Sequence, residues 1–184
     1  NNDNDLECIL SFLNSKIPEE IFKIFNPTFS LQTENILEIP VAKTLLETKN
    51  NPIFSELVDI SKKDWDYKEY SWDFKKSPLL NGGNSLEQAV QTWQDNVTQD
   101  FFQLHTNEEE LNRIFIDIYG LQEELTPEVA LKDITILQEE LNKNDLVALE
   151  DDFRANGADA IELPIDKGEV ISQLISYAIG LFRG

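Results

Sequence analysis

Residues 85–120 read SLEQAVQTWQDNVTQDFFQLHTNEEELNRIFIDIYG and carry the clearest helix signals of the chain. Ser85 and Gln88 form a capping box, a pattern that marks the start of a helix. Apolar side chains then recur every three or four positions, at Leu86, Val90, Trp93, Val97, Phe101 and Leu104. This period is typical of a helix that buries one face.

A second capping box, Thr106 with Glu109, follows directly and precedes another apolar run that ends before Gly120. Glycine is favoured just past the end of a helix. Two adjacent amphipathic helices with a short turn between them predict an antiparallel hairpin. His105 falls in that turn, where we expect it to be an ordinary surface or capping residue.

The rest of the chain extends this pattern to a mainly α fold, built of helical hairpins with a few short strands. Helical spacing also occupies residues 6–25, 42–64, 137–156 and 166–179. Alternation or short β-branched runs predict strands near residues 29–41, 133–136 and 160–163.

The amino-acid composition excludes several classes of protein and of functional site. The 184 residues are 41% hydrophobic, enough for one well-packed domain or two small ones. With only Cys8 and His105, neither a disulfide framework nor a Cys/His zinc site can form. No basic leader begins the chain and no apolar run approaches a membrane span. We therefore expect a soluble, cytoplasmic protein with no metal.

The net charge is −20, and it is distributed unevenly. Residues 41–80 hold seven acids and seven bases, whereas residues 107–169 hold eighteen acids and five bases. An acidic surface repels phosphate, so contact with nucleic acid is expected only in the neutral part or outside the chain.

The neutral part contains SKKDWDYKEYSWDFKKSP, residues 61–78, which places five large rings among nine charged residues. The rings are Trp65, Tyr67, Tyr70, Trp72 and Phe74. Burying such rings is worth roughly 1.5–3 kcal/mol each. The stretch therefore predicts either a docking surface for a partner or a connector packed against its own protein.

Signals for catalysis are missing from the sequence. Gly82 and Gly83 form a turn and not a phosphate loop, and no GxSxG context surrounds a serine. Asn26-Pro27-Thr28-Phe29 departs from the Asn-Pro-Pro-aromatic loop of amino-group DNA methyltransferases, and no glycine-rich cofactor turn precedes it. We predict no catalytic residue and a non-catalytic helical module.

Two long stretches resemble a known family. Residues 63–80, KDWDYKEYSWDFKKSPLL, and residues 107–129, NEEELNRIFIDIYGLQEELTPEV, are similar to parts of the large adenine-specific DNA methyltransferases of BREX phage-defence systems, the PglX group. Type IIG restriction–modification enzymes look similar. Shorter matches are residues 10–15, 26–28, 38–40 and 175–180, the first three resembling the end of a target-recognition region.

The resemblance implies an internal fragment of such an enzyme. Residues 1–41 would end a target-recognition region, residues 42–80 would form a helical connector, and residues 81–184 a helical spacer with a lineage-specific acidic insertion at 137–169. The parent would bind S-adenosylmethionine through residues elsewhere. Expected partners of the segment are the rest of the parent, double-stranded DNA through the parent and other defence-complex proteins, with no membrane contact. No cofactor is expected in the fragment.

Three functions remain open from the sequence. The leading one is a spacer that sets the distance between DNA recognition and catalysis, with Lys62, Lys63, Lys75 and Lys76 as candidate phosphate contacts. The second is an acidic module that docks a protein partner of a defence complex through its acidic helices and the aromatic stretch. The third, motivated by charge alone, is a DNA mimic that inhibits a DNA-binding enzyme.

Overall fold

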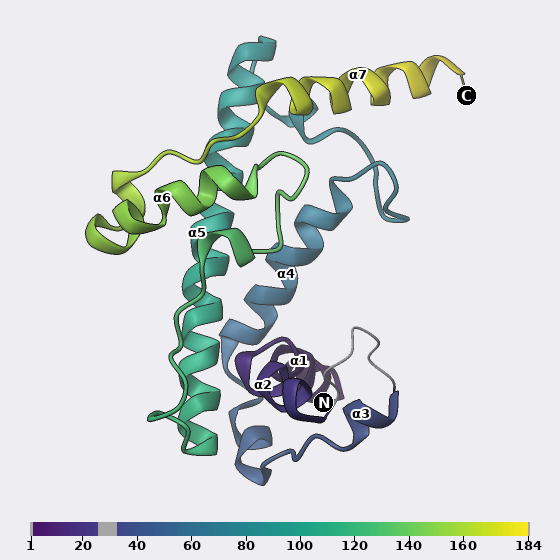
Figure 1. The fold of residues 1–184 in the computed structure, drawn as a ribbon. Coiled ribbons are helices and arrows are strands. Elements are labelled where there is room, and N and C mark those ends of the chain that lie inside the picture. Colours follow the sequence, from purple (N-terminus) through teal and green to yellow (C-terminus); the bar gives the residue numbers. More distant parts are fainter. Residues whose placement is uncertain (1, 26–32, 184) are drawn as a thin grey trace. The chain divides into compact units, whose positions relative to one another are not determined.

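The computed structural model describes residues 2–25 and 33–183, and within them the predicted mainly α fold is confirmed (Figure 1). The α-helices are α1 (Asn2–Leu13), α2 (Lys16–Phe25), α3 (Thr33–Leu37), α4 (Pro52–Asp66), α5 (Leu86–Tyr119), α6 (Lys143–Asn156) and α7 (Lys167–Arg183). Short 3₁₀ helices are η1 (Lys43–Thr48), η2 (Pro78–Asn81), η3 (Leu131–Asp133) and η4 (Ala158–Ala160).

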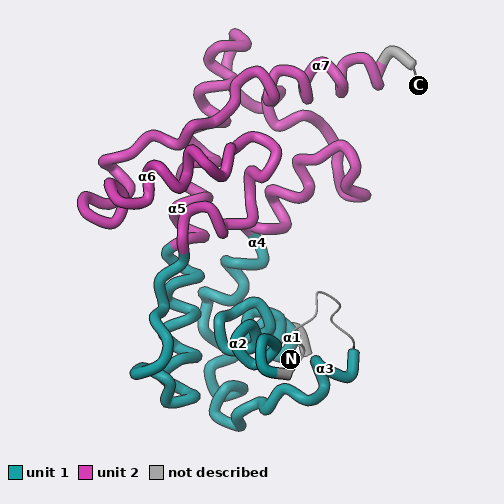
Figure 2. The backbone as a smooth tube through the Cα atoms, viewed as in Figure 1, with its two compact units in different colours: residues 1–59, 106–129 teal, residues 60–105, 130–184 magenta. Residues whose placement is uncertain are grey.

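The chain divides into two compact units (Figure 2). Unit 1 comprises residues 1–59 and 106–129, and unit 2 comprises residues 60–105 and 130–184. Helices α4 and α5 each contribute residues to both units. The division expected from the sequence, into residues 1–41, 42–80 and 81–184, stays a prediction. It was based on function, whereas the two compact units are defined by contacts between residues.

The hairpin predicted around His105 is wrong, because α5 runs unbroken through this position. His105 is only 2% exposed, and its ring meets the ring of Phe153 edge-on at 4.8 Å. Asn107 is also buried and donates from Nδ2 to Glu56 Oε2 at 2.9 Å. Residues on both sides of the expected turn thus pack inside their units, and packing of this kind stabilises a continuous helix more than local propensity does.

The predicted strands are also wrong wherever the structure describes them. Residues 33–37 form α3, and η3 occupies the start of the stretch at 133–136. Ile134 and Ile136 are both buried, but among the described residues they belong to no strand. Near residues 160–163, β-structure is limited to one antiparallel bridge, between Leu141 and Ile165. Residues 29–32 lie outside the described part.

Unit 1 has an aromatic core. Phe12 of α1 contacts Phe115 of α5 edge-on, with ring centroids 5.4 Å apart, and stacks on Tyr119 at 5.5 Å. Phe54 of α4 stacks on Phe115 from another direction at 6.1 Å. The Tyr119 hydroxyl donates to the Pro40 carbonyl at 2.7 Å. Aromatic pairs of this geometry add about 0.5–1.5 kcal/mol beyond their buried area.

Unit 2 contains the acidic segment 137–169, which is part of its core. Leu141, Leu146 and Leu163 are each buried, so the segment turns an apolar face inward. Helix α6 begins after an Asn142 cap, whose side chain accepts a hydrogen bond from the Asn144 amide at 2.8 Å. The helix predicted over residues 137–156 begins only at Lys143 and ends as predicted at Asn156, before Gly157, which adopts a φ of +84° that favours glycine.

A proline at position 106 tests the continuity of α5. Thr106→Pro should lower the free energy of unfolding by about 3 kcal/mol or more, because proline inside a helix removes a hydrogen bond and clashes with the preceding turn. Leu86→Pro is the matched control, since proline is tolerated at the first position of a helix. Urea denaturation followed by circular dichroism measures both. Equal tolerance of the two changes would favour the hairpin instead.

Candidate functional site

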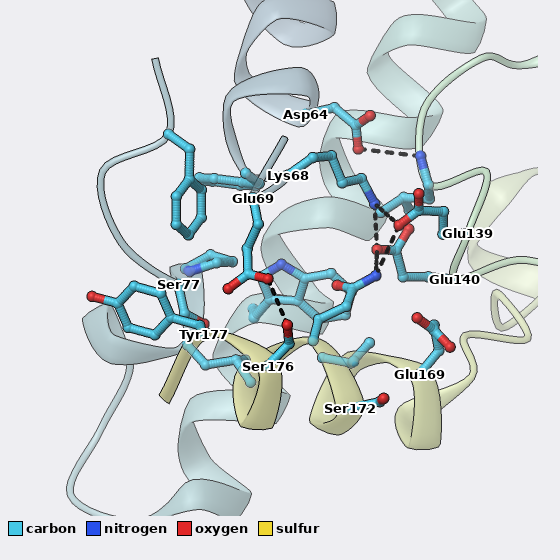
Figure 3. Close-up of a pocket in the computed structure, with 18 of the residues that line it drawn as sticks. Asp64, Lys68, Glu69, Ser77, Glu139, Glu140, Glu169, Ser172, Ser176 and Tyr177 are labelled. Carbon is cyan, nitrogen blue, oxygen red and sulfur yellow. Dashed lines mark hydrogen bonds and ion pairs between the residues drawn. The ribbon is translucent and has the colours of Figure 1, made fainter. Parts of the chain in front are cut away.

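Unit 2 contains a cavity of about 290 Å³ (Figure 3). Its wall is formed by the end of α4 and the aromatic stretch that follows, by η2, by Trp93 of α5, by residues 137–140 and by the first turns of α7. Segments far apart in the sequence therefore meet around one space.

A buried ion pair joins two of these segments. Lys68 is 8% exposed and Glu140 is 2% exposed, and Lys68 Nζ donates to Glu140 Oε1. Gln173 of α7 donates from Nε2 to the same oxygen at 2.8 Å. The Asp166 amide donates to the Glu140 backbone carbonyl at 2.8 Å. Glu140 thus connects the aromatic stretch to the start of α7.

The turn that presents Glu140 depends on a second carboxylate. Leu137 adopts a φ of +56°, an uncommon conformation for a residue with a side chain. Its amide donates to Asp64 Oδ1 of α4 at 3.2 Å. Burial raises the pKa of the Asp64 carboxyl, and the Leu137 hydrogen bond and the nearby Lys68 charge only partly oppose this.

Lys68 remains charged although it is buried. Burial alone lowers the pKa of its ammonium group, but the hydrogen bond and the attraction of Glu140 outweigh burial and raise it. Glu139 lies 3.6 Å from the same ammonium. The carboxylates around Lys68 therefore hold its proton at any pH near neutral.

Three further hydrogen bonds order the wall. Glu139 accepts from the Tyr70 hydroxyl at 3.3 Å and from Gln173 Nε2 at 3.2 Å. Ser176 of α7 donates to Glu69 at 2.7 Å. In the view of Figure 3, Glu139, Glu140 and Glu169 lie to one side of the cavity and Tyr177, Ser176 and Glu69 to the other.

Two buried polar atoms of the wall lack a hydrogen-bond partner within the described residues. They are the Oε2 atom of Glu140 and the Nε1 atom of Trp93. Buried polar groups are nearly always paired, and leaving one unpaired costs about 1–3 kcal/mol. Both atoms are closed off from solvent, so they are unpaired inside the wall and are not open to the cavity.

The five rings predicted as a docking surface separate into two groups. Tyr67, Tyr70 and Phe74 line the cavity, and Phe74 meets Tyr177 of α7 edge-on at 5.6 Å. Trp65 is 55% exposed and packs edge-on against Tyr70 at 5.1 Å, whereas Trp72 is fully exposed. The stretch thus combines the two readings that the sequence left open, a packed connector and an exposed aromatic surface.

The four predicted phosphate-binding lysines differ in their surroundings. Lys62 forms ion pairs with Asp66 at 2.5 Å and Asp73 at 3.1 Å, and Lys63 pairs with Asp100 at 2.6 Å. Lys75 and Lys76 are exposed, and no hydrogen bond or ion pair to either is found in the part of the chain that the structure describes.

Sequence reasoning missed Lys68, Glu140 and the cavity itself. Lys68 lies in the quoted aromatic stretch but looks like its neighbouring lysines, and Glu140 is one acid among many. The two residues are 72 positions apart, so only the fold brings them together. No local pattern signals the pair.

Metal binding and membrane insertion are two further possibilities for the described residues. Residues 2–25 and 33–183 contain no group of three or more His, Cys, Asp or Glu side chains arranged to hold a metal ion. None of the helices in these ranges is both long and apolar enough to span a bilayer. The Asn26–Phe29 motif lies outside the described residues.

Removing the Lys68 charge tests the buried pair. Lys68→Met should lower the free energy of unfolding by about 3–5 kcal/mol, because it leaves buried carboxylates uncompensated. Lys63→Met, which breaks a partly exposed pair, should cost about 0–1 kcal/mol. Adding Glu140→Gln to Lys68→Met should recover part of the loss in urea denaturation. Purely additive losses would argue against the pair.

No family model matches the chain. Among curated proteins, the adenine-specific methyltransferase PglX of Lacticaseibacillus casei (strain Zhang) is 35% identical over 154 residues, which cover 78% of this chain and 12% of that protein. The adenine-specific methyltransferase BrxX of Escherichia coli O9:H4 (strain HS) is 26% identical over 185 residues, which cover 100% of this chain and 14% of that protein.

The chain therefore spans only about an eighth of the length of the relatives it matches. Both relatives are named adenine-specific methyltransferases, the activity of the family that residues 63–80 and 107–129 resemble. The predicted resemblance is confirmed: this chain is similar to a segment of the adenine-specific methyltransferases PglX and BrxX.

Proposed function

We propose that this chain is a segment of an adenine-specific DNA methyltransferase of a phage-defence or restriction–modification system, and that it acts there as a helical scaffold. The observation that carries the proposal is the match of 78% of this chain to 12% of PglX. A match of this kind is what any internal segment of a much larger enzyme would give, and the scaffold role rests on the contacts described next.

Several features support a scaffold over a catalytic role. Lys68 and Glu140, the charged groups that unit 2 buries, bond to each other, and Glu140 also accepts from Gln173, an arrangement that fixes geometry. Helices α4 and α5 each contribute to the cores of both units. A spacer needs this kind of internal order, because a misplacement of about 1 Å at a reacting centre can cost a hundredfold in rate.

The chemistry of methyl transfer would come from the rest of the parent. Binding of S-adenosylmethionine in such folds uses a glycine-rich turn between a strand and a helix. In the described residues no strand leads into such a turn, and Gly82 and Gly83 connect η2 to α5. We therefore assign the methyl donor and the catalytic loop to residues outside this chain, and derive no step through them.

Replacing the segment in the parent tests the scaffold. With residues 42–180 exchanged for a flexible Gly/Ser linker, we expect binding of S-adenosylmethionine to be retained and N6-adenine methylation of duplex DNA to fall by about a hundredfold or more. Methylation at the normal rate would contradict the proposal. Loss of cofactor binding would place the segment in the catalytic site instead.

Contact with DNA is proposed for the lysines that flank the aromatic stretch. Of Lys62, Lys63, Lys75 and Lys76, the last two are the stronger candidates, because the first two already bond carboxylates of their own unit. A lysine that neutralises a phosphate releases a counterion, which makes binding depend on salt.

The salt dependence of DNA binding by the intact parent distinguishes these lysines. Lys75→Ala with Lys76→Ala should reduce the slope of log affinity against log salt by about 2, since each phosphate contact contributes about 0.9. Lys62→Ala with Lys63→Ala should change it less. Lys132→Ala with Lys143→Ala, both exposed in the acidic part, serve as the matched control. An unchanged slope for all pairs would exclude the contact.

A protein-docking role is the second candidate, and the fully exposed Trp72 favours it. A large ring without cover is typical of the centre of an interface. Co-purification of defence proteins with the parent, with and without Trp72→Ala, separates this role from spacing. Loss of a partner with methylation retained supports docking.

A further inference from the structure

We propose that the cavity of unit 2 binds an organic cation, a guanidinium or primary ammonium group carried on a short apolar chain. This goes beyond the scaffold role, because neither spacing nor methylation of DNA calls for such a ligand. The proposal rests on the charge, the rings, the unpaired Glu169 carboxylate and the size of the cavity.

The charge of the wall selects a cation. Five carboxylates and one ammonium line the cavity: Asp64, Glu69, Glu139, Glu140, Glu169 and Lys68. The single positive charge is already bonded to Glu140. An anion would face uncompensated negative charge in a site partly shielded from water, where charges interact strongly. A cation would be attracted by the same field.

The rings of the wall suit the flat or alkyl part of such a ligand. Tyr67, Tyr70, Phe74, Trp93 and Tyr177 all line the cavity. Aromatic faces attract a cation within about 6 Å of the ring centre, and guanidinium, being planar, also stacks on them. Rings together with carboxylates are the surroundings that recognise ammonium and guanidinium groups.

An unpaired acceptor gives an independent indication. Glu169, at the start of α7, lines the cavity, and no hydrogen bond or ion pair to its carboxylate is found among the described residues. Glu140 Oε2 also has no donor there, but it is closed off from solvent, so it adds charge to the wall and not an open acceptor. A ligand with N–H donors would satisfy the Glu169 carboxylate, which the protein itself leaves open.

The volume limits the size of the ligand. At about 290 Å³ the cavity lies just below the roughly 300–1,000 Å³ of pockets for drug-sized ligands. It therefore fits one amine or one side chain, and not a nucleotide. The cation could be a free small amine or an arginine or lysine side chain of another protein, and these two sources share the chemistry proposed here.

Trp93 provides a direct reporter of binding. The chain has three tryptophans, and Trp65 and Trp72 are exposed, so Trp65→Phe with Trp72→Phe leaves Trp93 as the sole fluorophore. We expect agmatine to change its emission saturably in the full 184-residue chain, and neutral butylurea to have no such effect. A flat titration with agmatine, or equal binding of butylurea, would overturn the proposal.

A pair of glutamate variants locates the site. Glu169→Gln should raise the dissociation constant for agmatine about tenfold, the value of one charge-assisted hydrogen bond of about 1.4 kcal/mol. Glu162→Gln, an exposed carboxylate outside the cavity wall, should leave it unchanged. Thermal melting confirms that both variants fold. Equal effects of the two changes would place binding elsewhere and overturn the assignment.

The source of the cation follows from a comparison of two probes. Tighter binding of the blocked tripeptide Ac-Gly-Arg-Gly-NH₂ than of agmatine supports a protein side chain, and the reverse supports a free amine. These measurements use neither DNA nor methylation. Their failure would leave the scaffold proposal intact, and failure of the scaffold test would leave the cation site intact.

Discussion

The structure of unit 2 depends on one buried cation among carboxylates. Asp64, Glu139 and Glu140 all lie close enough to Lys68 for their charges to stabilise its ammonium group. Without that charge the like-charged groups would repel in a medium that screens them poorly. Desolvation makes such a pair a weak source of net stability, but it makes the arrangement specific: any alternative packing of residues 137–140 would leave a buried charge unpaired.

Local sequence patterns predicted that residues 85–119 are helical, but wrongly predicted a turn within them. The capping box at Ser85 is real, since Ser85 Oγ accepts from the Gln88 amide at 3.2 Å. The equivalent pattern at Thr106 lies inside α5. Both patterns satisfy the same local rule, and the difference is set by Phe153 and Glu56, which are distant in sequence and hold His105 and Asn107 inside the units. No window of sequence around Thr106 contains that information.

The rings of the candidate site were visible in the sequence, and the buried pair of Lys68 and Glu140 was not. Residues 61–78 stood out because of their rings, and three of the five predicted rings do line the cavity. The neutrality of this region, however, does not mean that its lysines are available. Lys62, Lys63 and Lys68 each bond a carboxylate of unit 2. Charge counted along a sequence cannot separate lysines that hold the fold together from lysines that can meet a phosphate.

The same distinction applies to the acidic segment 137–169. Its apolar side chains are buried in unit 2, and Glu140 is buried with them. The acids that remain exposed include Asp145, Asp151 and Asp152 on α6. A segment that only added charge for solubility would not need to supply part of a core. Because this one does, its removal would change the cavity as well as the surface, and a docking role tested by deletion would be confounded by loss of packing. Substitutions confined to the exposed acids of α6 would separate the two effects, since α6 would keep the buried Leu146 and its caps.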